Sequence, residues 1–136
     1  MSRPVPYVHP INVRYLEVDR QGVVFNMWYL AYLDDAMTAF LHEGGLPYAD
    51  MLAAGYDAQL VHTELDWFGP LGLGDPAAVE VTVSRIGRTS FTLGFGVICG
   101  QRAVAEATTV YVAVRTDGSG KCELPPMLLD VLGPPS

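Results

Sequence analysis

The stretch VRYLEVDRQGVVFNMWYLAYLDDA, residues 13–36, joins two kinds of local structure. Its first part continues the segment HPINVRYL, residues 9–16, whose composition predicts a strand. After the turn residues Asp19 to Gly22, Asn26 is a suitable helix N-cap, and Gly44-Gly45 supplies a stop because glycine tolerates the left-handed conformation. Between them apolar side chains recur at helical spacing, at Tyr29, Leu30, Leu33, Met37, Phe40 and Leu41. The stretch therefore predicts a strand, a turn and a helix over about residues 26 to 43.

The second half of the chain has strand composition. After a short helical turn in PYADMLAAG come four segments rich in β-branched and aromatic residues, YDAQLVHTELDWFGPL, AAVEVTVSRIG, TSFTLGFGVIC and RAVAEATTVYVAVR. No helical pattern separates them, so we expect an antiparallel meander. In the third segment the alternate residues from Phe91 to Cys99 share one face, while Gly94 and Gly96 lie on the other, where something must approach closely. The fold class is α+β, with one long helix covering a curled sheet.

Composition limits the classes of function. A chain of 136 residues, half of them hydrophobic, fits a single domain over residues 1–136. The formal charge of −7 argues against a general nucleic-acid or membrane-surface binder. No apolar run is long enough to span a membrane, and the N-terminus does not resemble a signal peptide, so we expect a cytoplasmic protein with free thiols at Cys99 and Cys122. The Pro-rich ends, RPVPYVHP and GPPS, are expected to fray.

The segment from Asp19, D-x-x-G-V-V-F-N-M-W-Y-L-A-Y-L-D-D-A, resembles the signature of hotdog-fold acyl-CoA thioesterases, specifically the 4-hydroxybenzoyl-CoA thioesterase family. Four further matches follow in the family's order: GGLPY, DWFGPLGLGD, RIGRTSF and CELPPMLLDVL. The resemblance covers nearly the whole chain and implies a hotdog fold, an antiparallel sheet of about five strands wrapped around one long helix. The chain departs from the family at Asn26-Met27, where close relatives carry Tyr-Pro.

The resemblance implies that the carboxylate of Asp19 is catalytic, either as the nucleophile that attacks the thioester carbonyl or as the base that activates water. The backbone amide of Asn26, seven residues later, falls on the family's oxyanion-stabilising position at the start of the helix. Simpler interpretations remain beside these. Asp19 can be an ordinary turn former, and Asn26 a plain helix cap.

Further residues are candidates for substrate binding. Asp34 matches the acid that contacts the hydroxyl of the aromatic acyl group in the 4-hydroxybenzoyl branch, although a solvated helix face also explains it. Trp28 is a core or dimer contact that can also border the acyl pocket. Coenzyme A requires local positive charge in this acidic chain, and the turn SRIGRTS offers it, although a charged hairpin without a ligand also explains the turn. The proposed phosphate-binding residues are Arg85, Arg88, Thr89 and Ser90, with Arg102 and Lys121 as weaker candidates.

The sequence thus predicts an acyl-CoA thioesterase that needs neither a metal nor a redox cofactor. Hotdog subunits pair by sheet edges with the site at the junction, so we expect at least a dimer; tetramers occur in the family by two packings. The acyl group can be aromatic or fatty, and an acyl-carrier protein can replace CoA. A hotdog dehydratase lacks support because its Pro-Gly-rich run is missing, and a non-catalytic acyl-CoA-binding protein would not need Asp19. His62, Glu64 and Asp66 share a strand face, but this is more typical of a wet sheet face than of a metal site.

Overall fold

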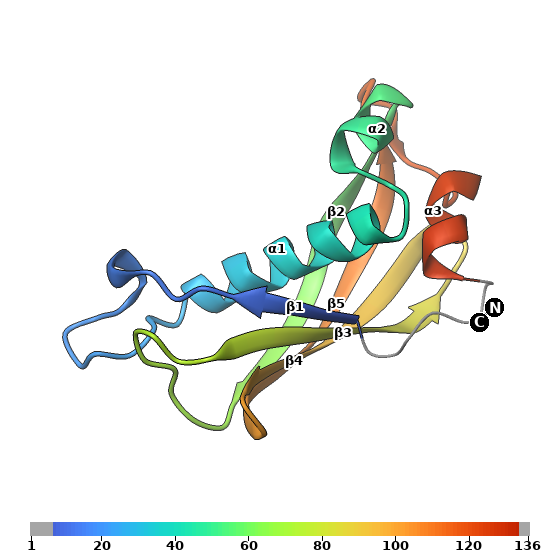
Figure 1. Ribbon diagram of the computed structural model, residues 1–136. Helices are drawn as coiled ribbons and strands as arrows, with labels where there is room; N and C mark the ends of the chain where they lie inside the picture. The colour runs from blue at the N-terminus through green and yellow to red at the C-terminus, as the bar shows by residue number, and fades with distance from the viewer. Residues whose placement is uncertain (1–6, 134–136) are drawn as a thin grey trace.

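The computed structural model describes residues 7–133 as one sheet with helices on one side of it (Figure 1). The sheet is antiparallel, with strand order β1-β3-β4-β5-β2, and the short β6 pairs with β5. Its strands are β1 (Tyr7–Ile11), β2 (Tyr56–Trp67), β3 (Ala77–Ile86), β4 (Ser90–Cys99), β5 (Arg102–Arg115) and β6 (Gly120–Lys121). The helices are α1 (Trp28–Glu43), α2 (Tyr48–Ala53) and α3 (Pro126–Leu132), with a 3-10 turn, η1, at Tyr15–Glu17.

The long helix α1 lies across the curled sheet and packs against β1 and β3. Its buried side chains are the apolar ones that recur at helical spacing, Tyr29, Tyr32, Leu33, Ala36, Met37, Phe40 and Leu41. Gly44 caps its C-terminus and Gly45 follows with φ of 100°, which confirms the predicted glycine stop. The helix begins at Trp28, two residues after the predicted bound of about 26, and its N-cap lies one residue after the predicted one. Met27, rather than Asn26, is the N-cap, and no side chain caps the helix, because backbone bonds from Trp28 to Phe25 and from Tyr29 to Asn26 form the preceding turn.

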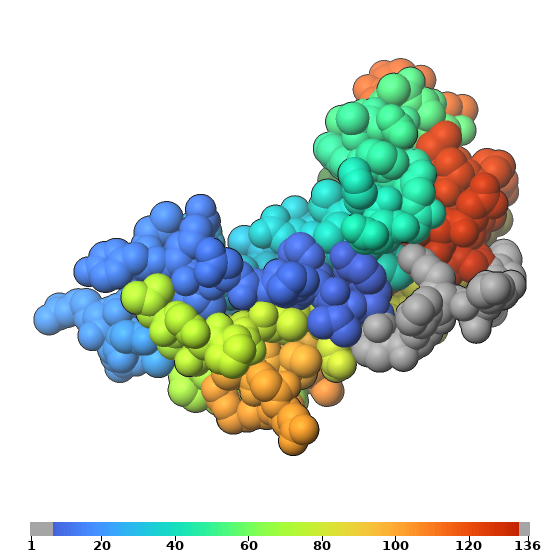
Figure 2. Space-filling model, viewed as in Figure 1, coloured from blue at the N-terminus to red at the C-terminus, as the bar shows by residue number. Residues whose placement is uncertain are grey.

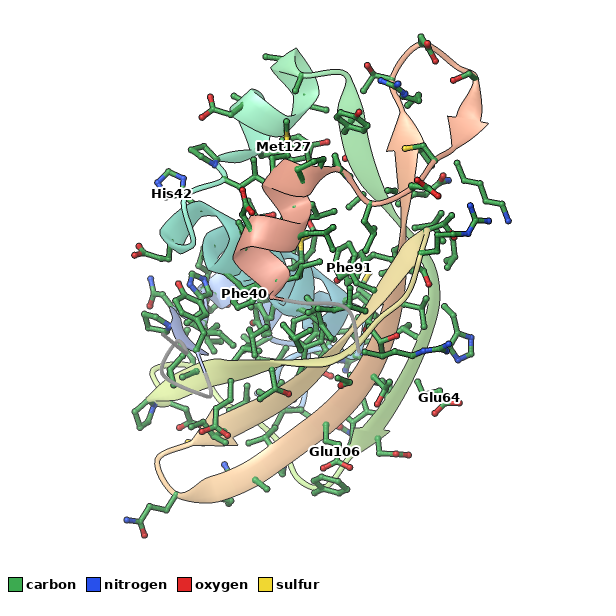
Figure 3. All side chains as sticks on the ribbon, turned by 90° about the vertical axis from the view of Figure 1, so that its right-hand side faces the viewer. Phe40, His42, Glu64, Phe91, Glu106 and Met127 are labelled. Carbon is green, nitrogen blue, oxygen red and sulfur yellow. The ribbon has the colours of Figure 1, made fainter. Side chains whose placement is uncertain are left out.

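The two faces of β4 differ as predicted. Phe91, Leu93, Phe95 and Val97 are buried against the helix side, and in Figure 3 Phe91 points into the interior toward Phe40 of α1. On the outer face, where Glu64 and Glu106 lie, the glycines allow a close approach. A Cβ atom on Gly94 would come within 2.9 Å of Thr82 Oγ1 on the neighbouring strand. The close neighbour expected from the sequence is therefore β3 itself.

Two expectations about the sheet are wrong. The first strand occupies Tyr7–Ile11 rather than residues 9–16, and residues 15–17 form the 3-10 turn η1; residues 7–10, expected to fray, belong to this strand, whereas residues 1–6 and 134–136 lie outside the described part. The four later strands form a meander only from β3 to β5. Strand β2 pairs with β5 instead of β3, so it lies at one edge of the sheet and β1 at the other.

Within residues 7–133 no helix is long and apolar enough to cross a membrane. Cys99 and Cys122 are free thiols, as predicted.

Candidate functional site

Asp19 lies at the tip of a small hairpin that leads directly into α1. The backbone bridge Val18–Val24 pairs the two arms, and the Asp19 N–H donates to the Val23 carbonyl at 2.9 Å. The turn closes with a bond of 2.9 Å from the Gly22 N–H to the Asp19 carbonyl, and Gly22 has φ of 79°, a left-handed conformation that favours glycine. The D-x-x-G spacing is therefore the spacing of a tight turn.

One of the two carboxylate oxygens of Asp19 is hydrogen-bonded within this turn. Its Oδ1 accepts the Gln21 N–H at 2.8 Å, whereas its Oδ2 has no hydrogen-bond partner within residues 7–133. The side chain borders a cleft of about 620 Å³, together with Tyr15, Val18, Arg20, Gly22 and Leu73. This cleft lies at the end of the molecule formed by the blue segment in Figure 2. The arrangement leaves one carboxylate oxygen available for chemistry in a partly apolar cleft.

The chain passes from the hairpin to α1 through Phe25, Asn26 and Met27, whose side chains are exposed. Among the described residues, the Asn26 N–H has no hydrogen-bond partner. It precedes the first turn of α1, where the positive end of the helix dipole lies. A free amide at this position is the type of group that stabilises an oxyanion.

Behind the hairpin lies a polar cluster that sequence reasoning missed. The side chain of Glu17 is buried, with 3% of the residue's surface exposed, and its carboxylate accepts hydrogen bonds from three donors. The Arg14 N–H and the Tyr32 hydroxyl reach Oε1 at 2.9 and 2.8 Å, and Arg14 Nε reaches Oε2 at 2.8 Å. Burial works to raise the pKa of Glu17, but the bonds from Arg14 and Tyr32 outweigh it and hold the pKa below its ordinary value.

The other predicted residues of α1 lie further along the helix. Trp28 is half-buried and packs against the core. Asp34 is exposed to solvent and borders a separate cleft of about 350 Å³ with Tyr48 and Asp57. Partial burial, and then the charges of Asp35 and Asp57, raise the pKa of Asp34 above its ordinary value. Within one chain Asp34 and Asp19 border different clefts.

The predicted phosphate turn lies at the far end of the sheet from Asp19. It connects β3 to β4, and in Figure 1 it is the yellow turn on the right, opposite the blue hairpin on the left. The strand between them has 10 residues, which corresponds to about 30 Å. Arg85 and Arg88 are exposed, and Arg88 pairs with Glu123 at 3.2 Å. Within the turn, the backbone carbonyl of Ser90 accepts the Gly87 N–H, and that of Thr89 accepts the Ala113 N–H. One chain therefore does not bring these residues to Asp19.

Comparisons with known proteins agree with this architecture. The family model described as the Thioesterase-like superfamily matches residues 13–132. A protein of Aquifex aeolicus (strain VF5) with the provisional name of an esterase is 30% identical over 129 residues, covering 94% of this chain and 98% of that protein. A 1,4-dihydroxy-2-naphthoyl-CoA hydrolase of Synechococcus sp. (strain CC9605) is 24% identical, covering 84% of this chain and 80% of that protein.

Solved structures share the fold over nearly the whole chain. A 1,4-dihydroxy-2-naphthoyl-CoA thioesterase from Synechocystis superposes with a TM-score of 0.85 at 21% identity, covering 93% of this chain and 95% of the other. The structure of BH1999, a gentisyl-coenzyme A thioesterase, superposes with a TM-score of 0.86 at 21% identity, covering 93% of this chain and 100% of the other.

A sheet curled around one helix, with an acid turn entering that helix, is the hotdog architecture, and the expected fold is confirmed. The chain belongs to the Thioesterase-like superfamily. The prediction of a thioester hydrolase is confirmed at this level.

Proposed function

We propose that the protein hydrolyses an acyl-CoA thioester and that Asp19 is its catalytic carboxylate. The observation that carries the proposal is the hairpin of residues 18–24, which presents Asp19 in a cleft with Oδ2 unbonded and then leads into the first turn of α1. A carboxylate acceptor and a helix-end amide follow each other within seven residues. In thioester hydrolysis such a carboxylate can begin the attack, and such an amide can stabilise the oxyanion.

Two routes fit this geometry. In the first, Asp19 removes a proton from water, and the resulting hydroxide adds to the carbonyl carbon. In the second, Asp19 itself attacks and forms a mixed anhydride, which water then opens. In both routes the carbonyl oxygen becomes an oxyanion beside the Asn26 N–H, the C–S bond breaks, and coenzyme A departs as the thiolate. The thiolate takes up a proton from the consumed water, which in the first route is the proton held by Asp19, so Asp19 returns to its ionised form. The products are a free acid and CoA, and no electrons are transferred, so the reaction needs no redox cofactor.

For the acyl group we favour a hydroxylated aromatic acid, of the 4-hydroxybenzoyl type. Two similar proteins carry names of hydrolases for aromatic acyl-CoA thioesters, the 1,4-dihydroxy-2-naphthoyl and gentisyl forms. Asp34, with its unbonded carboxylate and raised pKa, suits a hydroxyl donor at the far end of the acyl group. Fatty acyl and carrier-protein thioesters are the competing substrates.

A second subunit would complete the site. Strand β2 is an edge strand whose backbone pairs with β5 on one side. Two exposed apolar residues, Leu60 and Val61, lie on this strand. Pairing of two copies along β2 would cover them and give the acyl pocket a wall from each subunit. The arginine turn, which the length of β3 separates from the Asp19 end of its own chain, would then serve a neighbour's site.

The test is thiol release from a panel of acyl-CoA thioesters, with benzoyl, 4-hydroxybenzoyl, phenylacetyl, short-chain and long-chain members. Asp19→Ala should lower turnover by at least about 100-fold, the scale of a lost catalytic base. Asp130→Ala, which removes an exposed acid on α3, is the matched control and should keep wild-type turnover. Equal turnover in wild type and Asp19→Ala would refute the role of Asp19. A fully active monomer in sedimentation would refute the shared site.

A further inference from the structure

The inference concerns Glu17, and it rests on the proposed function of Asp19. We propose that Glu17 is a positioning residue that holds the Asp19 turn and the start of α1 in one fixed relation. Its carboxylate touches neither cleft residue Asp19 nor the Asn26 amide, so its effect on the reaction would be indirect.

The backbone of Glu17 forms the base of the hairpin of residues 18–24 that carries Asp19. Its carbonyl accepts the Phe25 N–H at 2.9 Å, and the next residue, Val18, makes the bridge to Val24. Glu17 therefore lies where the arm that carries Asp19 meets the arm that carries the oxyanion amide. A displacement of Glu17 would be transmitted to both arms.

The side chain of Glu17 ties this base to the helix. Tyr32 is four residues after Trp28, one helical turn into α1, and its hydroxyl donates to Glu17 Oε1 at 2.8 Å. The bond closes a ring made of the hairpin, the turn at 25–27 and the first turn of α1. Tyr32 is itself fixed, because it is buried and its ring meets Tyr29 edge to face with centroids 6.0 Å apart.

The chemistry of the contact explains why a carboxylate is needed. Three donors converge on Glu17, and an ionised carboxylate is an acceptor on both oxygens. The amide of glutamine has one oxygen and one NH₂ group, so one of the donors would face another donor. Glu17→Gln therefore keeps the size of the side chain while breaking the set of contacts. It is a sharper perturbation than Glu17→Ala, which would also leave a cavity.

A purely structural role for Glu17 makes a different prediction. If the residue only stabilises the fold, Glu17→Gln lowers the folded fraction or the unfolding temperature, and turnover per folded molecule is unchanged. If it positions the site, kcat per folded molecule falls while KM changes little, because the clefts that bind substrate remain. A misplacement of reacting groups by about 1 Å can cost on the order of 100-fold in rate.

The experiment compares wild type with Glu17→Gln, Tyr32→Phe and Glu43→Gln, below the unfolding temperature of every variant. Glu43→Gln is the control, since it is the same replacement at the exposed last residue of α1. We expect kcat to fall about 10- to 100-fold in Glu17→Gln, less in Tyr32→Phe, and not at all in Glu43→Gln. A double variant that combines Glu17→Gln with Tyr32→Phe should be no slower than Glu17→Gln alone. Both replacements disrupt the same contact, the hydrogen bond between the Tyr32 hydroxyl and the Glu17 carboxylate. Unchanged kcat per folded molecule in Glu17→Gln would overturn the inference.

Amide hydrogen exchange on the same proteins provides a test that needs no substrate. Glu17→Gln should speed exchange at Gly22 and Phe25, whose N–H groups bond within the hairpin, and leave the strands β3 and β4 as in wild type. If wild type hydrolyses no thioester, the proposed function fails, and exchange alone then decides the inference. Unchanged exchange at residues 19–25 in Glu17→Gln would overturn it on that ground.

Discussion

The two glycines on the outer face of β4 should respond oppositely to alanine. Neither has a positive φ, so an alanine backbone fits at both positions. At Gly96 the nearest atom to a new Cβ is Glu80 Oε1 at 3.5 Å, an ordinary van der Waals contact. At Gly94 the new Cβ would lie 2.9 Å from Thr82 Oγ1 and 3.3 Å from Ser84 Oγ, so at least one side chain must move.

The magnitudes decide the sign of each effect. Replacement of glycine by alanine gains about 0.4–1 kcal/mol through the unfolded chain, and Gly96→Ala should show this gain. In Gly94→Ala, rotation of Thr82 away from its rotamer costs about 0.5–1.5 kcal/mol. It also loses the long hydrogen bond of 3.4 Å from Thr82 Oγ1 to the Gly94 carbonyl, at the low end of about 0.5–1.5 kcal/mol. The two variants should differ in unfolding free energy by about 1–2 kcal/mol, with Gly94→Ala the less stable.

Equilibrium unfolding in urea at one fixed protein concentration measures the difference, since self-association would otherwise shift the midpoints. Thr82→Ala provides the control, because it removes the atom that the new Cβ would meet. Gly94→Ala should cost less in the Thr82→Ala background than in wild type. The reasoning about close strand approach would be refuted if Gly94→Ala were as stable as Gly96→Ala, or if Thr82→Ala gave no relief.

Three further predictions concern charged groups. Asp34→Asn should reduce the preference for 4-hydroxybenzoyl over benzoyl substrates without loss of stability at pH 7. Stability should not fall because the raised pKa of Asp34 means that its negative charge weakens the fold as pH rises through that pKa. A lower urea midpoint or an unchanged substrate preference would contradict this prediction. Arg88→Gln should raise KM for an acyl-CoA but not for the N-acetylcysteamine thioester of the same acid, which lacks phosphates, and equal effects on both would exclude a phosphate contact. Because the pKa of Glu17 is lowered, its ionised carboxylate stabilises the fold above the ordinary pKa of 4.5, and this stabilisation is lost as pH falls through the folded-state pKa. The difference in unfolding temperature between wild type and Glu17→Gln should therefore become smaller in acid.

The sequence predicted the elements of this fold better than their arrangement. Helical spacing identified α1, and alternation identified β4, because both patterns report which side chains are buried. The same patterns do not determine which strands are neighbours, and β2 lies beside β5 rather than β3. The segment at 9–16 was overread as one strand, since Tyr15 and Leu16 are apolar in type yet exposed on a 3-10 turn.

In the candidate site, too, the local features could be predicted from the sequence and the long-range contacts could not. Asp19 is a candidate because of its motif, which is local, whereas the role proposed for Glu17 depends on a contact with a residue 15 positions later. A single glutamate between Leu16 and Val18 gives no local sign of burial. The signal that was available is Tyr32, which lies on the apolar face of the predicted helix, because a buried tyrosine hydroxyl normally needs a hydrogen-bond partner.

The two acids of the hairpin, two residues apart, are distinguished by what their oxygens bind. Both oxygens of Glu17 accept hydrogen bonds, from three donors in total, so uptake of a proton or attack on a carbonyl would disrupt these bonds. In Asp19, one oxygen accepts the Gln21 N–H, and the other has no hydrogen-bond partner among residues 7–133. Turn formation and catalysis are therefore compatible roles for Asp19, because the bond that shapes the turn also orients the oxygen that it leaves unbonded. The turn interpretation describes one oxygen of this carboxylate, and the proposed catalytic role concerns the other.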